Sequence, residues 1–125
     1  MRLTVAITMA VGMMAPALVS AEESIIGKYT GDFIMSTSRG PIRTGLGLVL
    51  DRAEGGVVKG TATIFDWSCA GDYPMEGTFR EGKMQLRSTA KGGRAGDCSL
   101  RLNLAVDGGR LTGTTGSGQP VQLSK

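Results

Sequence analysis

The chain of 125 residues contains no histidine, only two cysteines, and few aromatic residues, which make up 5% of the sequence. Without histidine, the chain lacks the commonest general base and the commonest metal ligand of proteins. Nucleophile systems that depend on histidine, and zinc sites that contain it, are therefore excluded. Charged residues make up 20%, which is typical of one small globular domain and too little for a disordered polyelectrolyte.

An apolar run, Leu3–Val19, follows Arg2 near the start of the chain. Pro16 interrupts this run close to its end, and the small side chains that a signal peptidase reads end at Ala21. This layout is typical of a secretory signal peptide, so we predict cleavage after Ala21 and a periplasmic or secreted protein of residues 22–125. The alternative is an uncleaved membrane anchor, but the run is shorter than the roughly 20 residues that span a bilayer.

Cys69 and Cys98 are the two cysteines of the chain. In an oxidising compartment an even pair predicts one disulfide, which here would close a loop of about 30 residues and stabilise the fold by about 3–4 kcal/mol. The alternative is a redox-active pair, but such cysteines usually stand two residues apart at the start of a helix. We therefore predict a structural disulfide.

Alternation of apolar and polar residues with period two recurs after the signal segment, and glycine turns bound each run. In the clearest run, Cys98–Val106, apolar residues share one face while Ser99, Arg101 and Asn103 share the other. Asp107–Gly109 then provides a hairpin turn. Eight strands are predicted in this way, at residues 25–35, 42–50, 57–67, 73–79, 83–87, 98–106, 110–115 and 120–123.

The predicted strands follow one another through short connections, without a long crossover. This favours an all-β fold, an eight-stranded up-and-down antiparallel barrel, because closure leaves no exposed sheet edge. The alternative is a β-sandwich, which needs a long return connection of the Greek-key type. We expect inward apolar side chains to fill most of the barrel. Inward glycines at 27, 31, 60, 77 and 113 either leave room for a shallow apolar cup or mark sharp coiling of the strands.

Alternate connections of an up-and-down barrel lie at opposite ends. One end, the tight-turn end, is predicted to hold the connections at residues 51–56, 81–82 and 107–109. The other, the looped end, is predicted to hold those at 36–41, 66–72, 89–97 and 116–118, with Trp67 and both cysteines. We expect function at the looped end, because rigid scaffolds often place it on their longer loops. The alternative is a set of ordinary solvated loops.

The stretch Gly27-Lys28-Tyr29-Thr30-Gly31-Asp32-Phe33 resembles the opening strand of calycin-type barrels, the group of lipocalins and avidins. Lipocalins carry Gly-x-Trp in that strand, whereas this chain has Gly27-Lys28-Tyr29. The resemblance implies an eight-stranded meander barrel, often with a ligand in its cup. It implies no particular ligand, because the tryptophans that line the biotin site of avidins have no counterparts here and Trp67 is the single tryptophan.

The candidate binding residues are Trp67, Tyr73, Arg39, Arg43 and Arg94. An exposed tryptophan is a common binding anchor, although a tryptophan in this place often covers a disulfide or closes a barrel mouth. We predict an exported, non-catalytic binding module that recognises a protein, a glycan or a small apolar ligand through the loops at one barrel end. The alternative is an inhibitor of a secreted or envelope hydrolase, such as a protease or a lysozyme.

The sequence contains no pattern that supports catalysis or the binding of phosphate, calcium or nucleic acid. Asp66, Asp72 and Asp97 are carboxylates of the predicted looped end, but turn chemistry explains all three. The glycine-rich stretch 92–96 precedes no predicted helix, so it is not a phosphate-binding loop, and no calcium-loop spacing occurs. With few aromatic residues there is no stacking platform for nucleic acid. We therefore expect no enzyme activity, cofactor, metal ion or nucleic-acid partner.

Overall fold

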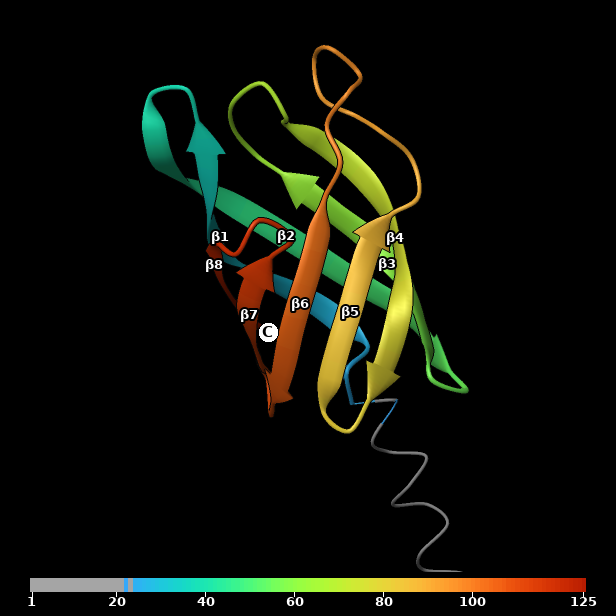
Figure 1. The fold of residues 1–125 in the computed structure, drawn as a ribbon. Coiled ribbons are helices and arrows are strands. Elements are labelled where there is room, and N and C mark those ends of the chain that lie inside the picture. Colours follow the sequence, from blue (N-terminus) through green and yellow to red (C-terminus); the bar gives the residue numbers. More distant parts are fainter. Residues whose placement is uncertain (1–21, 23) are drawn as a thin grey trace, which may run out of the picture.

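The computed structural model describes residue 22 and residues 24–125, which form a closed antiparallel barrel whose eight strands follow chain order (Figure 1). The strands are β1 (Gly27–Thr37), β2 (Gly40–Glu54), β3 (Val57–Ile64), β4 (Gly71–Arg80), β5 (Lys83–Ser88), β6 (Arg101–Asp107), β7 (Arg110–Thr115) and β8 (Pro120–Ser124). The predicted meander barrel is confirmed, and the sandwich is not formed. The predicted signal segment, residues 1–21, lies outside the described residues.

The barrel closes because β1 pairs with β2 on one side and with β8 on the other. Phe33 is the register partner of Thr44 on β2 and of Val121 on β8. Register partners point to the same face of a sheet, so the inward rows of neighbouring strands meet in layers. No helix in the described part of the chain is long and apolar enough to cross a membrane.

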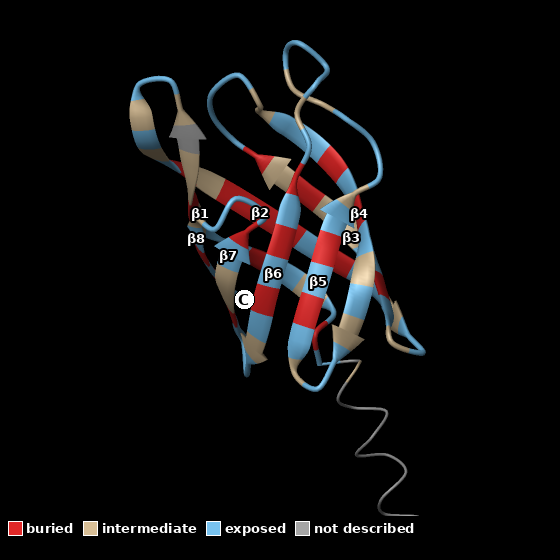
Figure 2. Cartoon of the chain, in the orientation of Figure 1, coloured by how far each residue is buried: buried red, intermediate tan, exposed pale blue. Residues whose placement is uncertain are grey.

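The inward rows form one apolar core, visible in Figure 2 as buried bands that alternate with exposed ones along β5 and β6. The alternation is the burial counterpart of the period-two sequence pattern, because successive side chains of a strand point to opposite faces. The largest fully buried side chains are Tyr29, Tyr73, Ile25, Leu46, Leu48, Leu50, Met84, Leu102, Leu111 and Leu123.

Glycines inside the strands mark close approaches between neighbouring backbones. A Cβ atom built on Gly77 would lie 1.7 Å from the carbonyl oxygen of Gln85. The corresponding distances to a carbonyl oxygen of a neighbouring strand are 1.9 Å at Gly31, 2.0 Å at Gly60 and 1.8 Å at Gly113. These glycines allow the sharp coiling of strands that a narrow barrel requires. Of the two explanations for inward glycines, the structure supports coiling at these four positions.

At the looped end, β3 and β6 stop short of their predicted boundaries. β3 ends at Ile64 rather than at residue 67, because Trp67 adopts a positive φ of 73° and lies in the loop that follows. β6 begins at Arg101 rather than at residue 98, because Cys98 forms an isolated bridge with Gly92 inside its own loop. In both places the alternation of the sequence continues into residues whose backbone has left the sheet.

β1 is shifted by two residues from its predicted position, and β2 is longer than predicted. β2 continues to Glu54 because it passes through a bulge between Leu50 and Arg52. At the other end of the same strand, Thr37 pairs with Gly40, so the connection predicted at residues 36–41 is a tight turn over residues 38–39. β1 and β2 therefore form a hairpin that extends past β7 and β8 at the looped end (Figure 1).

The residues before β1 cover the tight-turn end of the barrel. Ile25 is buried there, and its carbonyl oxygen accepts a hydrogen bond of 2.8 Å from the Tyr29 hydroxyl. The carboxylate of Glu22 accepts a hydrogen bond of 3.0 Å from the backbone N–H of Gly56. Lys125 Nζ donates to the Ser24 carbonyl at 2.6 Å. The barrel is therefore closed at this end, and any opening has to lie at the other.

Candidate functional site

The two ends of the barrel have the connections that the sequence predicts. The β2–β3, β4–β5 and β6–β7 turns lie at one end, and the β1–β2, β3–β4, β5–β6 and β7–β8 connections lie towards the other (Figure 1). The β3–β4 and β5–β6 connections are the longest of the barrel. The looped end therefore contains the longest stretches of backbone that lie outside the strands.

A disulfide joins the two long loops. Cys69 of the β3–β4 loop and Cys98 of the β5–β6 loop form a bond with an S–S distance of 2.04 Å, which confirms the predicted pairing. The backbone N–H of Arg94 donates a hydrogen bond of 2.8 Å to the Ser68 carbonyl. A Cβ on Gly93 would lie 2.8 Å from both the Cys98 sulfur and the Ser68 carbonyl oxygen, so only glycine fits there. The two loops thus form one tied unit.

Tyr73 lies beneath this unit and is fully buried. Its hydroxyl donates a hydrogen bond to the Cys69 carbonyl, and a Cβ on Gly92 would lie 3.0 Å from its ring. Burial, and to a smaller degree the negative charge of Asp97, raises the pKa of the Tyr73 hydroxyl above 10.0. The prediction that Tyr73 contacts a partner is therefore wrong, because its side chain has no exposed surface. Its even spacing from Met75, an inward residue of β4, is the sequence signal for this inward position.

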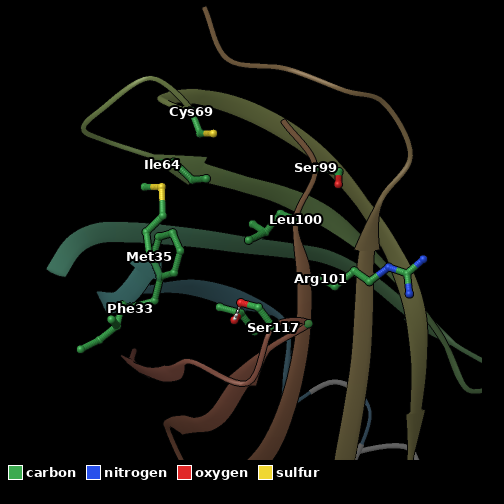
Figure 3. A pocket seen from close by; sticks show the side chains of 11 residues that line it. Phe33, Met35, Ile64, Cys69, Ser99, Leu100, Arg101 and Ser117 are labelled. Atoms are coloured by element: carbon green, nitrogen blue, oxygen red, sulfur yellow. Dashed lines mark hydrogen bonds between the residues drawn. The ribbon is translucent and has the colours of Figure 1, made fainter. Parts of the chain in front are cut away.

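A cavity of about 540 Å³ opens at the looped end (Figure 3). We call it the cup. Phe33, Ile64 and Leu100 are buried residues that line it, and Met35 and Cys69 are half-buried residues of its wall. Figure 3 shows that these side chains come from separate parts of the chain and surround one space, with Ser117 on the side opposite Cys69. The lining is therefore apolar inside, and it carries hydroxyl groups at its margin.

The lining residues of the cup are not among the predicted candidates, although the sequence contained a signal for them. Met35, Ile64 and Leu100 are the inward residues nearest the looped end on or beside β1, β3 and β6. In an up-and-down barrel, such terminal inward residues meet at one mouth. Ser99 and Arg101, which flank Leu100, also line the cup, and sequence reasoning assigned them no role.

Trp67 and Arg94 belong to the tied loops. Trp67 is 48% exposed, and it directly precedes Ser68, to whose carbonyl the Arg94 backbone is bonded. The structure therefore brings these two predicted residues into neighbouring backbone positions at the looped end. Trp67 does not line the cup, whereas Cys69, two residues later, does.

The other two predicted arginines lie apart from the cup. Arg39 is in the β1–β2 turn, where its backbone N–H donates a hydrogen bond of 3.1 Å to the Thr37 hydroxyl. Arg43 lies on the outer face of β2, with 71% of its side chain exposed, and its guanidinium is 3.5 Å from the Asp32 carboxylate. Neither arginine lines the cup. The five predicted residues therefore do not form one site.

The carboxylates of the looped end have local partners or face solvent. Asp72 accepts a hydrogen bond of 2.6 Å from the Thr63 hydroxyl, Asp97 acts electrostatically on Tyr73, and Asp66 is exposed. In the part of the chain that the structure describes, no three acidic or thiol side chains form a group able to hold a metal ion.

The looped end thus offers an apolar cup, hydroxyl and guanidinium groups at its margin, and an exposed indole on a tied loop. These groups can hold a ligand by apolar burial and by hydrogen bonding. A comparison with known protein families, curated proteins and solved structures found no match to this chain. Its function is therefore inferred from the geometry of the looped end.

Proposed function

We propose that the protein is an exported, non-catalytic binding module that takes a small apolar ligand into the cup. The observation that carries this proposal is the cup itself, a cavity of about 540 Å³ with buried apolar residues at its base. Ligand sites of proteins typically have volumes of roughly 300–1,000 Å³, with mostly apolar walls and a few polar groups that orient the ligand. The cup matches this description in both size and lining.

The tied loops support the proposal because they fix one wall of the cup. Cys69 lines the cup while its sulfur is bonded to Cys98 and its carbonyl accepts the Tyr73 hydrogen bond. A wall held by a covalent bond and a part-buried hydrogen bond loses little conformational freedom when a ligand binds. The cup is therefore organised in advance, and the free energy of burial is not spent on ordering the loops.

Apolar burial in the cup gives a modest affinity. A ligand that removes about 200 Å² of apolar surface from water, counted over both partners, gains about 5 kcal/mol. This corresponds to a dissociation constant of roughly 0.1–1 mM before further contacts are added and association entropy is subtracted. Polar contacts at the margin are needed for tighter binding.

The proposal is tested with N-phenyl-1-naphthylamine, an uncharged apolar dye that fluoresces when it leaves water. We expect saturable binding to the protein and at least a tenfold loss of affinity in Met35→Glu, because a carboxylate in the wall must be desolvated when the dye binds. Met35→Leu keeps the volume and the apolar character, so it is the matched control and should bind within about twofold of the unaltered protein. Absence of dye binding, or equal binding by Met35→Glu, refutes the proposal.

The exposed indole favours a second candidate function, that of an inhibitor of a secreted or envelope hydrolase. Trp67 stands on a loop that is tied by the disulfide and by the Arg94 hydrogen bond, as is suitable for insertion into the cleft of another protein. An inhibition panel of proteases and lysozymes tests this candidate. Inhibition that Trp67→Ala weakens at least tenfold supports it, and no inhibition at micromolar protein counts against it.

A further inference from the structure

A pair of arginines lies on the outer face of the barrel, just beyond the margin of the cup. Arg87 on β5 and Arg101 on β6 are register partners, and both are exposed. Directly opposite residues on one face of an antiparallel pair have Cβ atoms about 5 Å apart, and like charges in this arrangement repel each other. Within residues 22 and 24–125, no acidic side chain forms an ion pair with either arginine.

The neighbours of the pair compensate its charge only in part. Glu76 on β4 is the register partner of Arg87 on the far side from Arg101. Arg101 is flanked on its own far side by Gly116, whose N–H donates a hydrogen bond of 3.0 Å to the Arg101 carbonyl. A Cβ on Gly116 would lie 3.0 Å from the Arg101 Cβ, so the stem of Arg101 lies against this glycine. One carboxylate thus stands beside two guanidinium groups.

The two arginines border a recess that also contains hydroxyl groups. A cavity of about 390 Å³ is lined by Arg87, Ser88, Thr89, Ser99, Leu100 and Arg101. The Ser88 hydroxyl accepts a hydrogen bond of 3.0 Å from the Leu100 N–H, which leaves its proton available to a ligand. Guanidinium and hydroxyl donors around one cavity suit a carboxylate or a phosphate group.

The recess and the cup share a wall. Ser99, Leu100 and Arg101 line both cavities, and Leu100 points into the cup while the Arg101 guanidinium points away from it (Figure 3). Gly116, which also lines the cup, lies against the stem of Arg101, so the margin of the cup and the recess meet at Arg101. An elongated ligand can place one end in the cup and reach the guanidinium groups with the other.

We infer that the recess is an oxyanion subsite and that the ligand of the cup is an amphipathic anion. Its apolar part occupies the cup, and its carboxylate or phosphate group lies between Arg87 and Arg101. The anion relieves the repulsion between the two arginines and receives charge-assisted hydrogen bonds, which are about twice as strong as neutral ones. This inference rests on the proposed function, because it names the class of ligand for the same cup.

A like-charge pair elsewhere on the barrel provides a matched control. Arg52 on β2 and Lys59 on β3 are also register partners, but neither lines the cup or the recess. Arg87 and Arg101 therefore differ from this pair in their position beside the two cavities. Arg52→Gln removes one charge of the same kind without touching either cavity.

The test compares octyl phosphate, 1-octanol and inorganic phosphate by isothermal titration calorimetry at low salt. Octyl phosphate and octanol share one alkyl chain, and octyl phosphate and inorganic phosphate share one anion. We expect octyl phosphate to bind about tenfold more tightly than octanol, and inorganic phosphate to bind more weakly than either. Arg87→Gln and Arg101→Gln should each abolish most of this tenfold preference. Arg87→Gln, which alters a residue that does not line the cup, should leave the octanol affinity unchanged. Arg52→Gln should leave all three affinities unchanged.

The outcomes separate the inference from the proposed function. If octanol binds but octyl phosphate binds no more tightly, the cup remains a ligand site and the oxyanion subsite is refuted. Inorganic phosphate binding as tightly as octyl phosphate indicates an anion site independent of the cup, which also refutes the inference. If neither octanol nor octyl phosphate binds, the proposed function fails, and the inference fails with it.

Discussion

Tyr73 illustrates how one side chain supports the candidate site from beneath. It has a large apolar ring and one polar end, and the ring is buried while the hydroxyl meets the Cys69 carbonyl. A buried carbonyl that lacks a partner costs about 1–3 kcal/mol, so this hydroxyl stabilises the wall of the cup without touching a ligand. Tyr29 plays the same part at the opposite end of the barrel, where its hydroxyl meets the Ile25 carbonyl.

The ionisation of these two side chains gives the first prediction. Burial raises the pKa of both the Tyr29 and the Tyr73 hydroxyl above 10.0, and they are the two tyrosines of the chain. When the pKa of a hydroxyl is raised in the folded state, the buried neutral hydroxyl contributes its full stabilisation below pH 10. This stabilisation is lost as the pH rises through the pKa of the folded state. The free energy of unfolding should therefore fall above pH 10, which urea unfolding at a series of pH values measures.

Tyrosinate absorbance provides a direct readout of the same effect. At pH 10 the native protein should show less tyrosinate absorbance than the urea-unfolded protein shows at the same pH. Equal absorbance of the two states would contradict the raised pKa values. The double variant Tyr29→Phe/Tyr73→Phe serves as the baseline, since it has no ionisable phenol.

Arg101 gives a second prediction, on the stability of the free protein. Arg101→Gln removes the repulsion from Arg87, so the free energy of unfolding should rise by about 0.5 kcal/mol at low salt. Arg43→Gln is the comparison of opposite sign, because it removes an exposed ion pair with Asp32 and should lower that free energy by at most about 0.5 kcal/mol. Urea unfolding of the three proteins measures both changes, and a loss of stability in Arg101→Gln would contradict the assigned repulsion.

Among the elements, the strands could be predicted from the sequence because their signal is local. Cys98–Val106 alternates cleanly, and residues 101–106 of that stretch belong to β6. Residues 98–100 lie outside β6, because Cys98 is bonded to Cys69, far away in the sequence, and forms a bridge with Gly92. The cup escaped prediction for a related reason: Phe33, Ile64 and Leu100 become neighbours only when the barrel closes.

The glycines within strands follow the pairing of the elements. Gly60, Gly77 and Gly113 each lie against a carbonyl of their hairpin partner, in the pairs β2–β3, β4–β5 and β6–β7, and Gly31 does so where β1 meets β8. The short sequences Gly60-Thr61, Gly77-Thr78 and Gly113-Thr114 are similar, and the close approach of the two backbones explains the glycine in each of them. Around the barrel, every second pair of neighbouring strands thus has a glycine at which the two backbones approach closely.

A substitution at one of these glycines gives the third prediction. Gly77→Ala would place a Cβ 1.7 Å from the Gln85 carbonyl oxygen, so the strands must separate and we expect a loss of about 3 kcal/mol or more in the free energy of unfolding. Gly109→Ala is the control, because its Cβ would meet only the Lys125 Cβ at 3.5 Å, an ordinary contact. Chemical unfolding of both variants measures the difference, and equal stability would show that β4 and β5 adjust without cost.

For the molecule as a whole, the disulfide links the stability of the barrel to the shape of its mouth. Cys69 and Cys98 are 29 residues apart, and the segment between them contains β4 and β5. Closing a loop of this length restricts the unfolded chain, which is the main way in which a disulfide stabilises a small protein. The same bond holds the wall of the cup, so both effects should be lost together.

The double variant Cys69→Ala/Cys98→Ala tests this link and is the fourth prediction. We expect the free energy of unfolding to fall by about 3–4 kcal/mol, as measured by urea unfolding. At a urea concentration where the variant is still folded, its affinity for N-phenyl-1-naphthylamine should fall as well, because the loops must then be ordered on binding. Unchanged dye affinity in the folded variant would show that the disulfide stabilises the barrel without organising the cup.

The closed end of the barrel has a practical consequence for measurements on this protein. Lys125 lies at that end, where its backbone N–H donates a hydrogen bond of 2.8 Å to the Gly109 carbonyl of the β6–β7 turn. A linker attached after Lys125 therefore leaves the molecule on the side opposite the cup. Protein immobilised on a sensor surface through such a linker would present every cup to the solution in the same orientation, and the surface would not obstruct a ligand.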